Sequence, residues 1–530
     1  MSAAGPTGPR TRAPAVELQG VELLAGDAHD TALVANVRPS GRRNPQPAAR
    51  YNLVVLGAGT AGLVTAAGAA ALGAKVALVE RSLLGGDCLS SGCVPSKALL
   101  RAARFHNDLR QAPSFAGSAP VPSEPDFAGA MERMRRLRAQ ISRKDSVRRF
   151  EALGVDVFLG DGAFADRRTV EVAGATLRFQ RAVIATGSHA AHPPIASLAA
   201  AGYLTNETVF NLTERPRRLL VVGGGPLGCE LAQAFARLGS EVVIASREPY
   251  FLPGEERDAA EVLADALRRD GIEVRLNTEV KGVSRHDGEK LVRLVNDGQE
   301  TTVAVDEILV GAGRVPHVEG LNLEAAGVDY DHEHGVWVND YLQTSNRRIY
   351  AAGDVALAQK YTHMADATAR IVIQNALFWG RKKLSALTIP WCTYTDPEIA
   401  HVGLYVKECW ERGFPLKTFT VPMSDVDRAV LDGEPEGFVK IHVRDGTDTI
   451  LGATIVARHA GEMINEISLA MVAGIGLKTV SRVIHSYPTQ AEAIRKAGDA
   501  YHRTRLSPWL AALSHRWLAW SRGTRGRPWP

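Results

Sequence analysis

The sequence predicts an α/β fold in which a strand, a glycine-rich turn, a helix and a second strand follow one another twice, before an α+β region near the C-terminal end. The first of these units begins with an apolar strand at residues 53–56 and the second with one at residues 219–222. Strand-forming segments return at residues 438–443 and 450–457, ahead of helical segments. Because a chain of 530 residues exceeds the roughly 250–300 residues that one core supports, we expect three or four cooperating units.

Both predicted units alternate strand and helix patterns. An Ala-rich helix at residues 63–72 and a strand at 75–79 complete the first unit, and residues 229–238 and 241–245 complete the second. Strands that alternate with helices in this way form parallel sheets covered by helices on both faces. The sequence therefore predicts two Rossmann-like, doubly wound sheets.

Composition and charge exclude several classes of protein. The net charge is only +4, which argues against a nucleic-acid partner. No apolar run approaches the roughly 18–20 residues needed to span a bilayer. The first thirty residues also lack the apolar core of a secretory signal. We therefore expect a cytoplasmic protein. Five cysteines are too few for a disulfide framework, and a pair that oxidises in a reducing compartment is typically catalytic.

The first glycine turn predicts a dinucleotide site. It has the sequence Gly57-Ala58-Gly59-Thr60-Ala61-Gly62, lies between a strand and a helix, and is followed by Glu80 at the end of the next strand. Glycines let the backbone approach a pyrophosphate, the helix N-terminus offers free N–H groups, and the acid binds a ribose hydroxyl. An ordinary tight turn is the alternative, but it requires neither the helix nor the acid.

The second glycine turn differs from the first at the acidic position. It contains Gly223, Gly225 and Gly228, and the position equivalent to Glu80 is Ser246, followed by Arg247. Without the acid, and with an arginine beside it, this site favours the 2′-phosphate of NADPH over NADH. NADH as the cofactor and a solvated surface role for Arg247 remain the alternatives.

Two cysteines lie just after the first unit, in the segment Gly85-Gly86-Asp87-Cys88-Leu89-Ser90-Ser91-Gly92-Cys93-Val94-Pro95-Ser96-Lys97. Five residues of ideal helix would separate the two Cα atoms by roughly 8–9 Å, whereas a disulfide needs less than about 7 Å. The helix must therefore bend or unwind if Cys88 and Cys93 bond, and Gly92 would help. Two unrelated buried thiols are the alternative; no second ligand pair is spaced for zinc, so we expect no metal site.

The cysteine segment between two nucleotide-binding fingerprints resembles the flavoprotein disulfide reductases, which include dihydrolipoamide dehydrogenase, glutathione reductase and mercuric reductase. The resemblance extends from about residue 51 to residue 505. It implies that the fingerprint at residues 57–62 binds FAD and that the second binds the nicotinamide cofactor. Further FAD contacts implied by the resemblance are Thr186, Gly187, Gly353 and Asp354.

The resemblance also implies catalytic roles. Cys93 matches the thiol that contacts the flavin, and Cys88 matches the thiol that exchanges with the substrate. Lys97 and Glu230 match the ion pair beside the flavin. Members of the family are homodimers whose active site is completed by the partner subunit.

The segment His485-Ser486-Tyr487-Pro488-Thr489-Gln490-Ala491-Glu492 departs from the family pattern. Members that act on dithiols usually have His-x-His-Pro-Thr-x-x-Glu, in which the second histidine is the acid–base group and the glutamate orients it. Here Tyr487 replaces that histidine while Glu492 is retained, and His485 is interpreted as structural. A tyrosine with its usual pKa near 10 is a poor proton acceptor at neutral pH, which argues against dithiol exchange.

Tyrosine at this place resembles mercuric reductase, whose acceptor is a thiol-bound metal ion. Two features of that enzyme are absent from the sequence: the last cysteine is Cys409, so there is no vicinal pair near the C-terminal end, and no N-terminal Cys-x-x-Cys precedes the first unit. The leading hypothesis is NADPH-dependent reduction of a small-molecule or metal-ion acceptor that reacts with thiols. Dihydrolipoamide dehydrogenase activity and a slow flavoprotein redox sensor are the alternatives.

The expected domain order follows from these assignments: an N-terminal extension (1–50), an FAD-binding domain in two parts (51–190 and 316–388), an NAD(P)H-binding domain (191–315), a dimerisation domain (389–505) and a basic, Trp-rich tail (506–530). In the tail, Trp509, Leu513, Trp517 and Trp520 recur at helical spacing. Such a helix could contact a membrane surface, the dimer or the N-terminal extension.

Overall fold

The computed structural model describes residues 15–18, 21–115, 124–505 and 508–523 and divides the chain into two compact units. The first contains residues 1–253 and 267–387, and the second contains residues 254–266 and 388–530. Residues 254–266 therefore group with the C-terminal unit, although the expected NAD(P)H-binding domain includes them.

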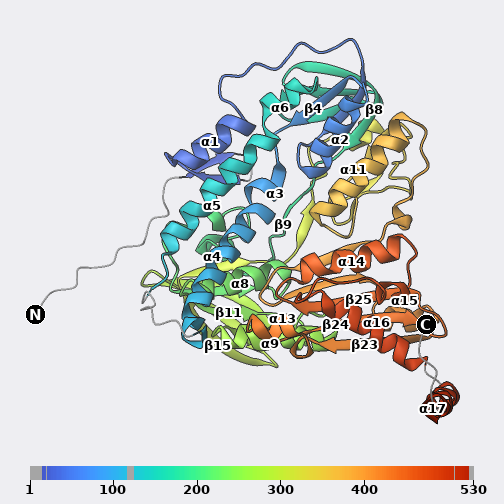
Figure 1. The fold of residues 1–530 in the computed structure, drawn as a ribbon. Helices are drawn as coiled ribbons and strands as arrows, with labels where there is room; N and C mark the ends of the chain where they lie inside the picture. The colour runs from blue at the N-terminus through green and yellow to red at the C-terminus, as the bar shows by residue number, and fades with distance from the viewer. Residues whose placement is uncertain (1–14, 19–20, 116–123, 506–507, 524–530) are drawn as a thin grey trace, which may run out of the picture. The chain divides into compact units, whose positions relative to one another are not determined.

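A seven-stranded sheet forms the centre of the first unit (Figure 1). Its order is β5-β4-β3-β8-β7-β6, with β20 paired to β8. The five strands β5, β4, β3, β8 and β20 run parallel, whereas β7 and β6 add an antiparallel edge. The strands are β3 (Tyr51–Leu56), β4 (Val76–Glu80), β5 (Asp156–Leu159), β6 (Gly162–Asp166), β7 (Thr169–Val172), β8 (Ala175–Ile184) and β20 (Ile349–Ala351).

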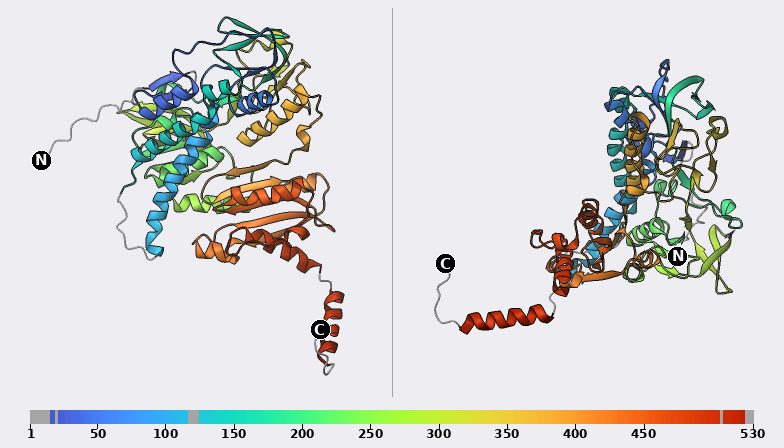
Figure 2. Two further views of the ribbon diagram at one scale, coloured as in Figure 1. Left: turned by 45° about the horizontal axis from the view of Figure 1, so that its top comes forward. Right: turned by 90° about the vertical axis from the view of Figure 1, so that its right-hand side faces the viewer.

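Helices from distant parts of the sequence pack together beside this sheet. Helix α2 (Thr60–Ala71) lies next to α11 (Thr362–Leu377), as both views in Figure 2 show. The long helices α4 (Cys93–Gln111) and α5 (Phe127–Ser142) pack against each other, and α4 also packs against α8 (Pro226–Arg237). This packing brings Lys97, which lies one helical turn after Cys93, close to the second nucleotide-binding fold.

The second parallel sheet has the order β12-β11-β10-β16. Its strands are β10 (Arg218–Val222), β11 (Glu241–Ala245), β12 (Glu273–Arg275) and β16 (Glu307–Val310). An antiparallel sheet of β13 (Thr278–His286), β14 (Glu289–Asn296) and β15 (Gln299–Val305) is also present. Both predicted strand–turn–helix units are thus confirmed as doubly wound folds.

The C-terminal unit is built on a five-stranded antiparallel sheet of order β21-β22-β25-β24-β23. Helices α14 and α16 pack against it, and Val439, Ile455 and Ile467 are fully buried in its core. The elements are β21 (Pro390–Thr393), β22 (Glu398–Gly403), β23 (Leu416–Pro422), β24 (Phe438–Arg444), β25 (Ile450–Ala457), α14 (Ala460–Val472) and α16 (Glu492–Thr504). The predicted α+β fold of this region is confirmed.

The tail forms a helix, α17 (Pro508–Gly523), and the last seven residues of the predicted tail lie outside the described part of the chain. The side chains of Trp509, Leu513, Trp517 and Trp520 are all more than half exposed. No helix among the described residues is both long and apolar enough to cross a membrane.

Candidate active site

The first glycine turn joins β3 to α2 with no space for side chains. Gly57 has φ +97°, and a Cβ atom there would lie 2.4 Å from the carbonyl oxygen of Ala185. A Cβ atom on Gly62 would lie 1.8 Å from the carbonyl oxygen of Gly57. Gly59 is the N-cap residue of α2, so the free N–H groups of Thr60 and Ala61 open onto the turn. The turn can therefore take an anionic group at the helix N-terminus.

Glu80 ends β4 beside this turn and is almost completely buried. One carboxylate oxygen accepts the N–H of Ala58 at 2.6 Å and the other accepts the N–H of Ser82 at 2.7 Å. Burial raises the pKa of Glu80. Each oxygen retains a second lone pair, so the group can still accept a hydrogen bond from a ribose hydroxyl.

A hollow lies at the carboxyl ends of these strands, beside the first glycine turn. Its lining includes Gly57, Glu80, Arg81, Thr186 and His317. The Thr186 hydroxyl donates to the His317 carbonyl at 2.7 Å, and the His317 ring lies against the Arg81 guanidinium. Burial, together with the charge of Arg81, lowers the pKa of His317 to about 3, so the ring is neutral. The residues present thus offer a neutral ring and a cation beside the Glu80 carboxylate, which is compatible with the adenosine end of FAD.

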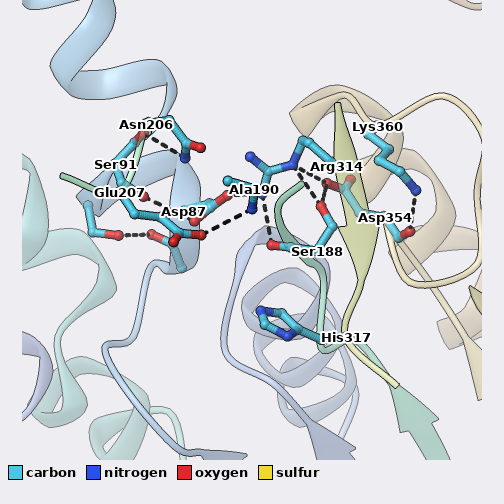
Figure 3. Close-up of polar contacts among 12 residues, drawn as sticks. Asp87, Ser91, Ser188, Ala190, Asn206, Glu207, Arg314, His317, Asp354 and Lys360 are labelled. Carbon is cyan, nitrogen blue, oxygen red and sulfur yellow. Dashed lines mark hydrogen bonds and ion pairs between the residues drawn. The ribbon is translucent and has the colours of Figure 1, made fainter. Parts of the chain in front are cut away.

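A network centred on Arg314 connects the cysteine segment to the other predicted FAD contacts (Figure 3). The Arg314 guanidinium forms an ion pair with Asp87 and donates to the Ser188 hydroxyl at 2.8 Å. Ser188 donates in turn to Asp354 at 2.7 Å, and Lys360 donates to the Asp354 carbonyl at 3.0 Å. Asp87 directly precedes Cys88, so this network fixes the start of the cysteine segment relative to Asp354.

The cysteine segment is broken as the Cα spacing requires. Helix α3 (Gly86–Ser90) ends before Gly92, and a new helix, α4, begins at Cys93. A Cβ atom on Gly92 would lie 2.9 Å from the Asp87 carbonyl oxygen, which explains why glycine occupies the bend. Both thiols are free in this structure; Cys88 is partly buried and Cys93 is exposed.

The surroundings of Cys93 favour its thiolate. A hydrogen bond from the Cys88 thiol, the Thr362 hydroxyl 3.2 Å away and the charge of Lys97 together lower the pKa of Cys93 to about 6, although partial desolvation of the sulfur by surrounding atoms opposes them. The pKa of Cys88 is raised, chiefly because its proton is shared with Cys93. The pair therefore holds one proton on Cys88 and one negative charge on Cys93 at neutral pH.

Lys97 and Glu230 form the predicted ion pair. The Lys97 Nζ atom lies 2.7 Å from a Glu230 carboxylate oxygen, and Glu230 is almost completely buried. Lys97 follows Cys93 by four residues on α4, so both side chains lie on one face of that helix. Helix α8, which carries Glu230, packs against this helix.

The second glycine turn repeats the geometry of the first. Gly223 has φ +105°, and Cβ atoms on Gly223 and Gly228 would clash with the carbonyl oxygens of Gly311 and Gly223 at 2.6 and 2.3 Å. Gly225 is the N-cap residue of α8. Ser246 is buried after β11, and the next residue, Arg247, is exposed. An exposed arginine at this place is accessible to a phosphate on the ribose.

Tyr487 and Glu492 lie in the C-terminal unit and do not contact one another through a hydrogen bond. The exposed Tyr487 phenol donates to Asp427 at 2.8 Å, and this hydrogen bond raises the pKa of Tyr487. Glu492 instead pairs with Arg495 at 2.7 Å, and its second oxygen is buried with no partner among the described residues. His485 is held by Glu466 at 3.1 Å, which agrees with a structural role.

Sequence reasoning did not single out Arg314, Thr362 or Asp427. Arg314 directly follows the glycine turn after β16, and that position was the available signal. Thr362 begins α11 with no motif to mark it, and Asp427 is distant in sequence from Tyr487.

Comparison with known proteins identifies the family. Residues 51–370 match the pyridine nucleotide-disulphide oxidoreductase model, and residues 389–498 match the dimerisation domain of pyridine nucleotide-disulphide oxidoreductases. This chain belongs to that family. It is accordingly an FAD-dependent oxidoreductase whose reductant is NAD(P)H, and its dimerisation domain supports a homodimer.

Individual relatives differ in their acceptors. A mercuric reductase of Staphylococcus aureus is 35% identical over 453 residues, covering 86% of this chain and 83% of the relative. A dihydrolipoyl dehydrogenase of Thermus scotoductus is 35% identical over 464 residues, covering 86% of this chain and 98% of the relative. The Cu(II) complex of RclA, an HOCl-induced flavoprotein disulfide reductase of Escherichia coli, is similar in structure, with a TM-score of 0.76, 28% identity and coverage of 84% and 98%.

The low pKa of Cys93 predicts a pH-dependent optical signal. In the two-electron-reduced protein, a Cys93 thiolate against the flavin should give a long-wavelength absorption band. Because a thiol with a pKa of about 6 is protonated below that pH, the band should be present at pH 7 and disappear as the pH falls through about 6. Anaerobic absorption spectra across this pH range measure it.

Variants assign the band to one sulfur. Cys93→Ser should abolish it, Cys88→Ser should preserve it, and Cys392→Ser serves as the control for an unrelated cysteine. A band that persists in the Cys93 variant would refute the assignment.

Proposed function

We propose that this protein oxidises NADPH, passes the electrons through FAD to a Cys88–Cys93 disulfide, and reduces a thiol-reactive acceptor, with mercuric ion as the leading candidate. The observation that carries the proposal is the replacement of the expected base by Tyr487, whose phenol is hydrogen-bonded to Asp427. Because this bond raises the pKa of Tyr487, the phenol remains protonated at neutral pH and cannot accept the proton of a dithiol. A soft metal ion needs no such base, since its bond to sulfur displaces the thiol proton directly.

The proposed roles follow the charges of the site. FAD, when bound, supplies the two-electron carrier between the nicotinamide and the cysteines. Lys97, paired with Glu230, places a positive charge beside Cys93 and favours its thiolate. Cys88 retains its proton until it bonds to the acceptor. We assign the exchange with the acceptor to Cys88 because it matches the exchanging thiol of the family.

Two further functions have specific support. The similarity to a dihydrolipoyl dehydrogenase favours dithiol exchange, but Tyr487 opposes it. The similarity to the HOCl-induced RclA favours a role in redox stress, either as a reductase of another metal ion or as a slow sensor. Steady-state NADPH oxidation with Hg(II)–thiol complexes, Cu(II), lipoamide, glutathione disulfide and quinones discriminates among them. Turnover with lipoamide alone would overturn the proposal.

The proposed assembly is a homodimer in which Tyr487 and Glu492 of one subunit complete the site of the other. The match to the dimerisation domain supports the dimer. We place the enzyme in the cytoplasm, because a catalytic cysteine pair in an otherwise cysteine-poor chain suits a reducing compartment.

We propose that NADPH is preferred because Ser246 and Arg247 replace an acid. Arg247→Glu removes a phosphate partner and adds repulsion, so kcat/KM for NADPH should fall by about 100-fold. The value for NADH should fall by less than about tenfold, because NADH has no phosphate there. Arg178→Glu, the same change at an exposed arginine of β8, controls for net charge. Equal losses with both cofactors would show that Arg247 does not bind the phosphate.

Tyr487→His should raise lipoamide reductase activity by at least about tenfold, since general-base assistance typically contributes about 10²–10⁴ in rate. Either Asp427 or Glu492 could orient the introduced imidazole. Tyr487→Phe is the matched control, because it removes the phenol without adding a base and should give no gain. If the histidine variant binds FAD and shows the thiolate band but gains no turnover, the shape of the pocket excludes dithiols.

The tail helix α17 is proposed to contact an anionic membrane surface. Its exposed tryptophans face outward, and residues 501–530 contain six arginines and no acid. The full-length protein should co-sediment with phosphatidylglycerol vesicles and not with phosphatidylcholine vesicles. Trp517→Ser combined with Trp520→Ser should weaken this binding; undiminished binding would contradict the assignment.

A further inference from the structure

Residues 21–50 of the N-terminal extension belong to the folded first unit, although they precede the region that the family model matches. Helix α1 (Ala28–Val37) lies beside α5 (Figure 1). Asp27 caps it by accepting the N–H groups of His29 and Asp30, and Leu33 and Val37 are fully buried. The match to the family model begins at residue 51, so this helix lies outside the matched region.

A buried ion pair connects the extension to α5. Asp30 and Arg138 are 2% and 1% exposed, and their charged groups are 2.6 Å apart. The second Asp30 oxygen accepts the N–H of Leu24 at 3.0 Å. Two charges removed from water in this way fix each other's position, because neither can rotate out to solvent.

The other arm of Arg138 reaches the cysteine segment. Its second terminal nitrogen donates to the Ser90 carbonyl at 2.6 Å. Ser90 is the last residue of α3 and lies between the two cysteines. Asn206 holds the next carbonyl, that of Ser91, at 3.2 Å. The bend between Cys88 and Cys93 is thus held through two successive carbonyl groups.

The extension also holds the chain that leads to Cys88. Arg38 donates to the carbonyls of Arg81 and Ser82, both at 2.7 Å. These residues lie between Glu80 and the cysteine segment. The extension therefore holds the backbone on both sides of Cys88: Arg38 holds it before that residue, and Asp30, through Arg138, holds it after that residue.

We propose that Asp30 and Arg138 are positioning residues for the redox pair: the extension, through this ion pair, fixes the Ser90 carbonyl and thereby holds Cys88 where it can bond to Cys93. The inference rests on the proposed redox role of the two cysteines. Neither residue touches the reacting atoms. They act by raising the effective concentration of the Cys88 sulfur at the Cys93 sulfur.

The predicted consequence is a change in the balance between disulfide and dithiol. In glutathione buffer, the Cys88–Cys93 disulfide and two glutathione thiols give two cysteine thiols and one glutathione disulfide. A bend that is held in place lowers the entropy lost when the two sulfurs bond, so it favours the disulfide. Releasing the bend should favour the dithiol. It should also weaken the hydrogen bond from Cys88 that stabilises the Cys93 thiolate.

Asp30→Asn tests the inference in the full-length, FAD-loaded protein, because it keeps the shape of the side chain but removes the charge that holds Arg138. Asp27→Asn is the matched control. Asp27 forms an ion pair with Arg135 at 3.0 Å between the same two helices, and Asn preserves its cap. Among the described residues, Arg135 makes no hydrogen bond or ion pair with the cysteine segment.

In Asp30→Asn, the ratio of disulfide to dithiol at a fixed glutathione poise should fall by roughly tenfold, the factor that one charge-assisted hydrogen bond contributes. The pH midpoint of the thiolate band should rise by about one unit. Asp27→Asn should match the wild type in both measurements. Thiol trapping with mass spectrometry and anaerobic spectra supply the two readouts, and neither requires a known acceptor.

A folded, FAD-loaded Asp30→Asn protein with the wild-type ratio and midpoint would overturn the inference. If that variant does not fold, Asp30→Glu is tested instead, because it keeps the charge but displaces Arg138. A shift in the disulfide-to-dithiol ratio and in the pH midpoint of the band supports the inference. No shift overturns it. Failure of the wild-type pair to oxidise at all would instead overturn the proposed function.

Discussion

The break between α3 and α4 at Gly92 is the constraint on which the rest of the site depends. An unbroken helix would hold Cys88 and Cys93 too far apart to share a proton or a bond. The break also makes Cys93 the first residue of a new helix, whose positive N-terminal end favours a thiolate. The same helix carries Lys97 one turn later and packs against the helix that carries Glu230. The bend at Gly92 thus places Cys93 at the start of a helix, which favours its thiolate. It also places Lys97 one turn later, where its positive charge lies beside that thiolate.

The features that the sequence predicted are those encoded by residues close together in the chain. Gly62 cannot carry a side chain because of a contact with Gly57, five residues earlier, so the spacing of these glycines identifies the turn. The bend near Gly92 was predicted from the five-residue spacing of the two cysteines, on the condition that they bond. The duplicated strand and helix patterns gave both parallel sheets for the same reason.

The contacts that the sequence did not predict join residues that are far apart in the chain. Arg314 and Asp87 are separated by 227 residues, Thr362 and Cys93 by 269, and Arg138 and Asp30 by 108. No local pattern marks such pairs, because each residue is ordinary in its own segment. Tyr487 illustrates the same limit: its departure from the family motif was evident, but its hydrogen bond to Asp427 and the turn of Glu492 toward Arg495 were not.

The buried Asp30–Arg138 pair has a consequence for where the folding unit begins. A shortened chain that starts at residue 51, where the match to the family model starts, would lose both the counter-charge of Arg138 and the helix α1 that packs against α5. Losses of a few kcal/mol are a large part of the stability of an ordinary domain. The folded unit of this protein therefore begins before the first residue that the family model matches.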